Sequence, residues 1–240
     1  MQSDLDKHIY AYGNSFKYSL DNELTLNWYP HRIIKKMKKG SILELGLGHG
    51  YTTKTFSKNT NRYLIIEGSI EVINKFKKNN SLSNIEIQHC YFEDFQSNEK
   101  FDNIIMGFIL EHVDDPDFII DRYKTFLKSD GKLFITVPNS ESLNRRVGYE
   151  AKLLQDLEYL SDADLLLGHK RYYNLNKLTD MAAKHNLKII SKEGIFLKSI
   201  TTDQIKKLNL SKEILNGYMK VGINYPELCH SILLELDFVS

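Results

Sequence analysis

The 240-residue sequence has few cysteines, little net charge and no long apolar run, and each absence excludes a class of protein. Cys90 and Cys229 are the only two cysteines, so there is neither a disulfide framework nor a zinc-binding cysteine pattern. The longest apolar run, Ile104 to Leu110, is far shorter than the roughly 20 residues that cross a bilayer. Lysine and arginine number 32 against 31 aspartates and glutamates, a balance that disfavours nucleic acid or an anionic membrane surface as the partner.

Targeting and linker signals are absent as well. The first seven residues lack the basic start and apolar stretch of a signal peptide, and the scarcity of cysteine fits a reducing compartment, so we expect a cytoplasmic protein. No internal repeat, low-complexity tract or Pro/Gly/Ser-rich linker divides the chain. With 42% hydrophobic and 26% charged residues, the composition is that of an ordinary globular protein, and we expect a single domain over residues 1–240.

Short runs of Ile, Leu, Val and Phe alternate with stretches of helical period from residue 41 onward. Strands are expected at Ser41–Leu45, Arg62–Glu67, Asn84–His89, Phe101–Phe108, Gly131–Pro138, Lys188–Phe196 and Ser231–Asp237. Helices are expected at Gly50–Lys58, Ile70–Asn79, Pro116–Lys128 and Asn174–His185. Because parallel strands need helical crossovers, the pattern predicts a Rossmann-like α/β fold: a doubly wound, mostly parallel seven-stranded sheet with helices on both faces.

Two regions fit this alternation poorly, the first 40 residues and roughly Ser140 to Tyr173. Both are polar and aromatic, and both are expected to be partly helical, over Glu23–Lys38 and Gly148–Leu160. We expect them to cover the edge of the sheet at which a ligand binds.

A glycine-rich turn joins the first predicted strand to the first predicted helix. Gly46, Gly48 and Gly50 follow the apolar run Ile42–Leu45. Glycine permits positive φ and lets a ligand approach the main chain beside a helix N-terminus, which indicates a nucleotide-type ligand. The dinucleotide fingerprint G-x-G-x-x-G fits poorly, because Tyr51 occupies its third glycine position.

Two acids refine the ligand. Glu44 stands at the end of the first strand, where a carboxylate repels a diphosphate and suits a ligand with an ammonium group, as S-adenosylmethionine has. Glu67 ends the second strand at a spacing typical of an acid that accepts hydrogen bonds from ribose hydroxyls. Gly68 beside it allows an adenosine to come close.

Together these residues resemble class I S-adenosylmethionine-dependent methyltransferases. Glu44, Gly46, Gly48 and Gly50 match the family motif E/D-x-G-x-G-x-G, and Glu67 matches its ribose-binding acid. Residues 110–116 and 127–133 are similar to the patterns that flank strands 4 and 5 in the small-molecule branch, and the resemblance covers about residues 40 to 200. It implies that S-adenosylmethionine is the methyl donor and S-adenosylhomocysteine the product.

The resemblance also divides the domain. It implies an N-terminal helical cover at 1–40, a cofactor-binding half at 41–138, an insert over the acceptor site at 139–173 and a C-terminal substrate half at 174–240. Further cofactor-binding residues are expected where strands end: Ser69, Tyr91, Phe92, Glu93, Gly107 and Phe108. The family often has an aspartate for the adenine amino group where this chain has Tyr91. We expect Tyr91 or Phe92 to pack on the adenine and Glu93, Asp94 or a main-chain group to contact its amino group.

Methyl transfer from a sulfonium is an in-line displacement, so the enzyme must align the acceptor, exclude water and remove a proton from it. His112 follows the fourth strand and is the first candidate for the general base, since imidazole titrates near neutral pH. The alternative is that Glu111 and His112 only hydrogen-bond the turn. His169 is the second candidate, in a segment similar to an H-x-R-Y/F element of related enzymes.

Four residues are expected to bind the acceptor, namely Tyr12, Glu111, Arg171 and Tyr172. Arg171 suits a phosphate or carboxylate on the acceptor, although an ion pair within the fold is the alternative. Tyr12 belongs to an aromatic N-terminal segment that either closes over the site or packs against the sheet. No metal site is expected, because the acid and asparagine cluster of catechol-type enzymes has no counterpart here.

The acceptor itself is left open by the family resemblance. A neutral charge and the absence of an Asn/Asp-Pro-Pro-Tyr motif after the fourth strand disfavour RNA and DNA. Residues 137–139, 168–169 and 225–228 resemble the corresponding segments of methyltransferases from bacterial surface-polysaccharide and sugar-modification pathways. The leading hypothesis is therefore O-methylation of a small anionic or sugar-like acceptor: a sugar, a nucleotide-linked sugar or a capsule precursor such as a phosphoramidate.

Other functions remain open at this point. The first alternative is N- or O-methylation of a quinone, lipid precursor or secondary metabolite. A non-catalytic nucleoside-binding module and a nicotinamide oxidoreductase are the alternatives from other classes, the latter disfavoured by Glu44 and Tyr51. Neither a nucleic acid nor a membrane is expected as a partner, and the protein is expected to be a monomer or a homodimer.

Overall fold

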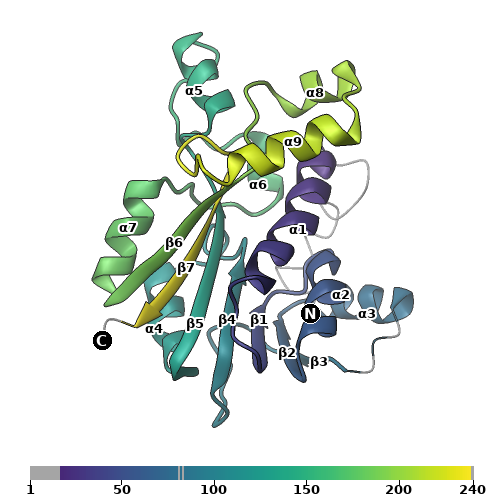
Figure 1. The fold of residues 1–240 in the computed structure, drawn as a ribbon, viewed down its shortest axis with the longest axis vertical. Helices are drawn as coiled ribbons and strands as arrows, with labels where there is room; N and C mark the ends of the chain where they lie inside the picture. The colour runs from purple at the N-terminus through teal and green to yellow at the C-terminus, as the bar shows by residue number, and fades with distance from the viewer. Residues whose placement is uncertain (1–16, 81, 83, 239–240) are drawn as a thin grey trace.

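The computed structural model describes residues 17–80, 82 and 84–238, which form a seven-stranded sheet between two layers of helices (Figure 1). The strands are β1 (Ser41–Leu45), β2 (Arg62–Glu67), β3 (Glu86–His89), β4 (Phe101–Gly107), β5 (Leu127–Pro138), β6 (Leu187–Ile195) and β7 (Ser231–Phe238). Their order in the sheet is β3-β2-β1-β4-β5-β7-β6. The predicted fold class is confirmed.

Strand direction divides the sheet into two parts. β1 to β5 pair in parallel, with Leu45 of β1 opposite Ile66 of β2 and Met106 of β4. β7 lies between β5 and β6 and runs antiparallel to both. The carboxyl ends of the parallel strands therefore share one edge, and the turn that precedes β7 comes to the same edge.

Helices flank the sheet. They are α1 (Ser19–Ile34), α2 (Tyr51–Phe56), the 3₁₀ turn η2 (Ser57–Asn59), α3 (Ile70–Asn79), α4 (Pro116–Lys124), α5 (Leu143–Glu150), α6 (Asp162–Leu166), α7 (Leu175–Lys184), α8 (Thr202–Leu208) and α9 (Lys212–Gly222). Within the described residues, none of these helices has the length and apolar character needed to span a bilayer.

The core consists of two apolar clusters, one on each face of the sheet. One cluster contains residues of α4 and α7, and the other contains residues of α1, α2 and α3. Successive strand residues alternate between them, as Ile104 and Ile105 of β4 show. Strands buried on both faces read as continuous apolar runs, and this is why the sequence predicted them well.

Local signals set several helix starts as expected. Asp115 caps α4 by accepting a hydrogen bond from the Phe118 amide at 3.0 Å, and Pro116 occupies the first turn. The predicted end of this helix at Lys128 was wrong, since α4 ends at Lys124 and β5 begins at Leu127. Leu127 pairs with Phe101 of β4, so sheet hydrogen bonding competes with the helix for this segment.

The two irregular regions are helical at other positions than predicted. α1 covers Ser19–Ile34, and the insert forms α5 and α6 in place of one helix at Gly148–Leu160. Lys152 interrupts the predicted helix, because its φ of 58° lies in the left-handed region. Beyond it, the Arg145 guanidinium of α5 binds the carbonyl oxygens of Leu157 at 3.0 Å and Tyr159 at 2.7 Å.

The insert returns to the sheet edge where it left. Asn139, directly after β5, forms a parallel bridge with Tyr173, and the Ser140 amide donates to the Tyr173 carbonyl at 2.7 Å. The chain between these two points starts and ends at the carboxyl ends of the strands.

Gly107 ends β4 and lies against Tyr29 of α1. A Cβ added at Gly107 would come within 2.2 Å of the Tyr29 hydroxyl oxygen and 2.9 Å of its Cζ, and the Tyr29 ring is buried. The absence of a side chain at Gly107 therefore lets α1 lie against the end of β4.

We predict that Gly107→Ala lowers the free energy of unfolding by about 1–3 kcal/mol, the usual cost of overpacking a core. Gly217→Ala is the matched control: it lies inside α9 with no atom within 4 Å of the added Cβ. The control should raise stability by up to about 1 kcal/mol, because alanine is the better helix former. Urea denaturation measures both, and equal effects of the two substitutions would contradict the contact.

Candidate active site

A cavity of about 910 Å³ opens at the carboxyl ends of the parallel strands. Its lining comes from α1, the turns after β1, β2 and β4, the loop after β3, the insert, the loop after β6 and the turn before β7. This is the edge at which open α/β sheets bind ligands. Of the predicted site residues, all but Arg171 and Tyr12 line this cavity; Tyr12 lies outside the described residues.

The glycine turn after β1 forms one wall. Gly46, Gly48 and Gly50 have φ of 81°, 49° and 71°, values that disfavour any other residue. A Cβ at Gly46 would lie 2.8 Å from Ile109, and one at Gly50 would lie 2.6 Å from Phe76. The turn thus needs glycine for its backbone and for its close packing, as the sequence predicted.

Glu67 braces this turn from the end of β2. Its two carboxylate oxygens accept hydrogen bonds from the Leu47 amide at 2.9 Å and the Ser69 amide at 2.7 Å. Burial raises the pKa of Glu67, and the amide hydrogen bonds oppose that rise. Each carboxylate oxygen has a second lone pair, so the residue keeps the capacity to accept a hydroxyl donor from the cavity.

Glu44 is buried behind the turn at the end of β1. Thr52 donates to one of its oxygens at 2.7 Å, and the Tyr63 hydroxyl donates to the other. Burial raises the pKa of Glu44 from 4.5 to about 7, against the opposing effect of these hydrogen bonds. Glu44 also lines the cavity, so a cation there would favour its charged form.

The loop after β3 brings Tyr91, Phe92 and Glu93 to the cavity. Tyr91 is half exposed, whereas Phe92 packs partly against the core, and its ring is 3.9 Å from a Cβ built at Gly46. Phe92 is therefore the aromatic ring that lies beside the glycine turn.

Phe108 follows β4 with a φ of 58°, an uncommon conformation for a residue with a side chain. Its amide donates to the Thr136 carbonyl at 2.8 Å, and its ring meets Tyr29 edge to face at 5.8 Å between centroids. These two contacts hold the backbone turn that directs the following residues into the cavity.

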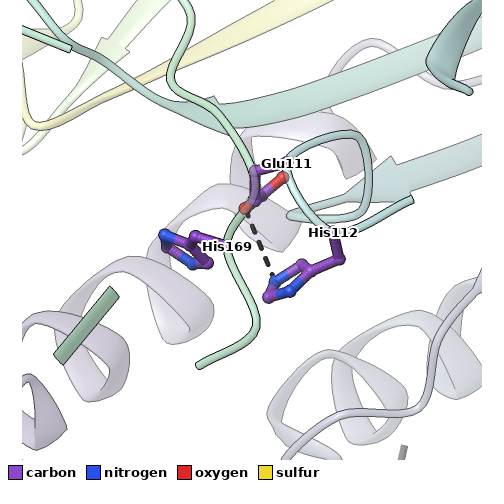
Figure 2. Close-up of side chains that lie close together, drawn as sticks. All are labelled: Glu111, His112 and His169. Carbon is purple, nitrogen blue, oxygen red and sulfur yellow. Dashed lines mark ion pairs between the residues drawn. The ribbon is translucent and has the colours of Figure 1, made fainter. Parts of the chain in front are cut away.

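Glu111, His112 and His169 gather beyond this turn (Figure 2). A Glu111 carboxylate oxygen lies 4.0 Å from His112 Nε2, and the two imidazoles meet edge to face at 4.8 Å between centroids. The structure thus brings together the two histidines that the sequence offered as alternative bases.

Burial perturbs two of the three groups. Glu111 is fully buried, neither of its side-chain oxygens receives a hydrogen bond, and burial raises its pKa to about 8. Burial lowers the pKa of His169 to about 4. His169 Nδ1 also lacks a hydrogen-bond partner, although Asp164 Oδ1 is 3.7 Å away. Perturbed groups that cluster in a cavity are typical of functional sites.

Arg171 differs from the expectation that it contacts the acceptor. Its guanidinium donates to the carbonyl oxygens of Leu110 at 3.0 Å, Asp114 at 3.1 Å and Val113, and it is not among the residues that line the cavity. An arginine occupied by three carbonyls has little capacity left for a ligand anion. Its place in the structure is that of a support for the turn after β4.

Tyr172 reaches the cavity with its hydroxyl already bonded, 3.0 Å from Asp164 Oδ1. The guanidinium of Arg145 lies over the Tyr172 ring, 4.2 Å from its centroid, and also lines the cavity. Arg145 was not predicted from the sequence; the basic pair at 145–146 inside the insert was the available signal.

A polar cluster in the lining of the cavity was also not predicted from the sequence. Lys198 donates to Asp21 and, at 2.9 Å, to Thr202, and His230 Nε2 lies 3.6 Å from Asp21. Asp21, Lys198 and His230 line the cavity, and Asp21 Oδ1 has no hydrogen-bond partner. Asp21 and Lys198 are 177 positions apart in the sequence, so no local sequence pattern predicts their contact.

Comparison with known proteins agrees with this geometry. A family model described as a methyltransferase domain matches residues 25–192. A ubiquinone biosynthesis O-methyltransferase of Pelagibacter ubique is 26% identical over 166 residues, which cover 67% of each chain. An enzyme of the same name from Actinobacillus pleuropneumoniae is 35% identical over 107 residues, covering 41% of this chain and 45% of that protein.

The fold is shared with solved structures. One is 1,6-didemethyltoxoflavin-N1-methyltransferase of Burkholderia thailandensis with bound 1,6-didemethyltoxoflavin and S-adenosylhomocysteine. It is 13% identical, with a TM-score of 0.63 over 98% of this chain and 87% of that chain. Another is a possible histamine N-methyltransferase of Thermotoga maritima, 15% identical, with a TM-score of 0.64 over 92% of both chains.

We predict that Glu44 makes the stability of the ligand-free protein depend on pH. Its folded pKa is about 7 against an ordinary 4.5, so between these values only the unfolded chain is ionised at this residue. The contribution of Glu44 to the free energy of unfolding therefore falls as pH rises through this window, by at most about 1.4 kcal/mol per pH unit for one proton.

Glu44→Gln should remove this contribution, so its free energy of unfolding should fall less, or rise more, with pH than that of the wild type, and the exposed Glu71→Gln should leave the wild-type slope unchanged. Urea denaturation at several pH values between about 5 and 8 gives both slopes. A Glu44→Gln variant with the wild-type slope would show that Glu44 is ionised throughout the range.

Proposed function

We propose, because the chain belongs to the S-adenosylmethionine-dependent methyltransferases, that it methylates a hydroxyl of a small polar acceptor: a sugar, a nucleotide-linked sugar or a surface-polysaccharide precursor, with phosphoramidate-type precursors included. The observation that carries the acceptor class is the buried Asp21–Lys198 pair, with the part-buried His230 beside it, in the lining of the cavity.

The cofactor half of the cavity suits the methyl donor. Glu67 accepts the ribose hydroxyls with the lone pairs that its two amide hydrogen bonds leave free. Glu44 faces the ammonium of the methionine part, and Phe92 packs on the adenine with Tyr91 and Glu93 beside it. When bound, the donor supplies an electrophilic methyl group on a sulfonium.

Acceptor selection follows from the cost of burying polar atoms. Asp21 Oδ1 is buried without a partner, and a hydroxyl of the acceptor would supply the missing hydrogen bond. An acceptor without a donor group at this point would leave the oxygen unpaired, which is a strong basis for rejection. Arg145 in the same cavity suits a phosphate or carboxylate, the role first given to Arg171.

Proton removal from the hydroxyl is the step that needs a protein group. His112 and His169 are the candidates, because they are the imidazoles next to the turn after β4. The low pKa of His169 keeps its ring neutral at physiological pH. Thr25, Tyr29 and Phe108 line the cavity and exclude water from the reacting atoms.

A second candidate acceptor is a phenolic quinone precursor. It is favoured by the names of the two ubiquinone biosynthesis O-methyltransferases, of which the chain spans 67% and 45%. The buried charges of Asp21 and Lys198 favour the polar acceptor over a quinone precursor, because a quinone with an apolar tail offers them few hydrogen-bond partners.

We predict that Glu67→Ala weakens the binding of S-adenosylhomocysteine by about 1–3 kcal/mol, as expected for the loss of hydrogen bonds to a charged group. Calorimetric titration measures the affinity. Glu71→Ala, which changes an exposed acid that does not line the cavity, is the comparison that separates a ribose contact from a general change in charge. Wild-type affinity in a folded Glu67→Ala protein would remove Glu67 from the site.

We predict that phosphorylated or nucleotide-linked sugars are methylated and simple phenols are not. Arg145→Gln should raise KM for an anionic sugar by about 10- to 150-fold, the range for losing a hydrogen bond to a charged group, with the S-adenosylhomocysteine affinity unchanged. An acceptor screen with radiolabelled methyl donor tests the class. If phenols were methylated efficiently and sugars were not, the phenolic quinone precursor would replace the sugar as the proposed acceptor.

A further inference from the structure

We propose that Glu111, His112 and His169 form a binding site for a divalent transition-metal cation. Each offers one ligand atom, and the three atoms lie within 4.8 Å of one another, the one group of three such residues in the part of the chain that the structure describes. Figure 2 shows the three side chains close together, with Glu111 facing His112 and with His169 on a separate segment of the chain beside them.

Unsatisfied groups are the first argument for a cation. Glu111 has no exposed surface, and neither of its carboxylate oxygens receives a hydrogen bond. His169 Nδ1 is buried and unpaired as well. A buried polar group without a partner is costly, and a carboxylate more so, and a cation bound here would pair with the Glu111 carboxylate.

The two segments are fixed to each other, so the cluster does not depend on loose side chains. The Lys170 amide donates to the Glu111 carbonyl at 2.8 Å. Arg171 binds the carbonyls on either side, those of Leu110 and Val113. His169 is thereby held next to the turn that carries Glu111 and His112, although 57 residues separate it from His112 along the chain. Ligands on rigid backbone are what a metal site needs.

A carboxylate stands behind one ligand. Asp164 Oδ1 lies 3.7 Å from His169 Nδ1, and Asp164 itself is buried and held by Ser161 and Tyr172. A small rotation of the ring would form this hydrogen bond and leave the other ring nitrogen for the cation. A histidine that binds a metal through one ring nitrogen usually donates the N–H of the other to a carboxylate or carbonyl oxygen, and Asp164 offers such a carboxylate.

The donor set selects the kind of cation. Two imidazoles and one carboxylate suit zinc, cobalt, manganese or iron(II) better than magnesium or calcium, which prefer oxygen ligands. Metal–ligand bonds of about 2.0–2.2 Å require the three atoms to approach one another by roughly an ångström, within the reach of side-chain rotation. Three protein ligands leave at least one position open.

All three residues line the cavity in which the proposed acceptor binds, so an acceptor hydroxyl could take the open position, and this step rests on the proposed function. An acceptor hydroxyl bound there loses its proton to water more readily, because the cation stabilises the alkoxide. The alkoxide oxygen then forms the bond to the methyl carbon, and the electron pair of the C–S bond returns to sulfur. In this form of the reaction the two imidazoles act as ligands and the cation replaces a free imidazole base.

The test begins with metal binding alone, without methyl donor or acceptor. The full-length protein, dialysed against chelator, is titrated with Zn²⁺ by calorimetry, with Mg²⁺ as the comparison ion and Co²⁺ absorption as a report on the ligands. We expect one saturable Zn²⁺ site and no Mg²⁺ binding of similar strength. Glu111→Gln and His169→Ala should abolish the site, and Asp164→Asn should weaken it by about 10- to 100-fold, the usual effect of an outer partner.

His31→Ala is the matched control, because His31 is an exposed histidine of α1 outside the cavity. It should bind Zn²⁺ as the wild type does. Circular dichroism establishes that each variant is folded. Absence of saturable Zn²⁺ binding by the folded wild type, or equal binding by His169→Ala and His31→Ala, would overturn the proposal.

Binding of S-adenosylhomocysteine is measured in parallel with and without Zn²⁺. This measurement tests the nucleoside site separately, so a protein that binds the nucleoside and not the metal would refute the metal site while leaving the proposed function intact. Once an acceptor is known, chelation should lower kcat and added Zn²⁺ should restore it. If the metal-free protein were as active as the metal-loaded protein, the cation would have no part in the reaction, and an imidazole would be the base that removes the proton.

Discussion

The hydrogen bonds of the Arg171 guanidinium position the part of the cavity that holds Glu111, His112 and His169. The guanidinium ties together three carbonyl oxygens of the turn after β4, and its own segment carries His169. Without it, the turn would lose three of the hydrogen bonds that hold it against the insert, and the Lys170–Glu111 and Tyr173–Leu110 hydrogen bonds would remain. The arginine thus determines how the cofactor half of the chain meets the insert, and the position of Glu111 and His112 follows from that.

Much of the cofactor half could be predicted from the sequence, because its signals are local. The glycines at 46, 48 and 50, and the acids that end β1 and β2, are all fixed by strand ends and turn geometry. Arg171 shows where this reasoning stops. Its residue type suggested a ligand for an anion, and only the folded chain reveals that three carbonyls already occupy it.

The acceptor half was less predictable for the same reason. Asp21 and Lys198 come from α1 and the loop after β6, and their contact is formed entirely by the topology. The expected helix at Gly148–Leu160 is interrupted at Lys152, which has a φ of 58°, and Arg145 then binds carbonyls of the segment beyond it. Long-range contacts such as Asp21–Lys198 place the residues that we propose to select the acceptor, and a single sequence does not display them.

The place of β7 has a consequence for how the protein is made. β7, the last strand along the chain, lies between β5 and β6, so β6 has no neighbour in the sheet until β7 has entered. β1 to β5 have no such requirement, and they are synthesised before β7. The strands that carry the glycine turn and Glu67 are therefore available to pair before β7 is made. Lys198 follows β6 and His230 directly precedes β7, so the polar cluster to which they belong is completed only after β7 has entered the sheet.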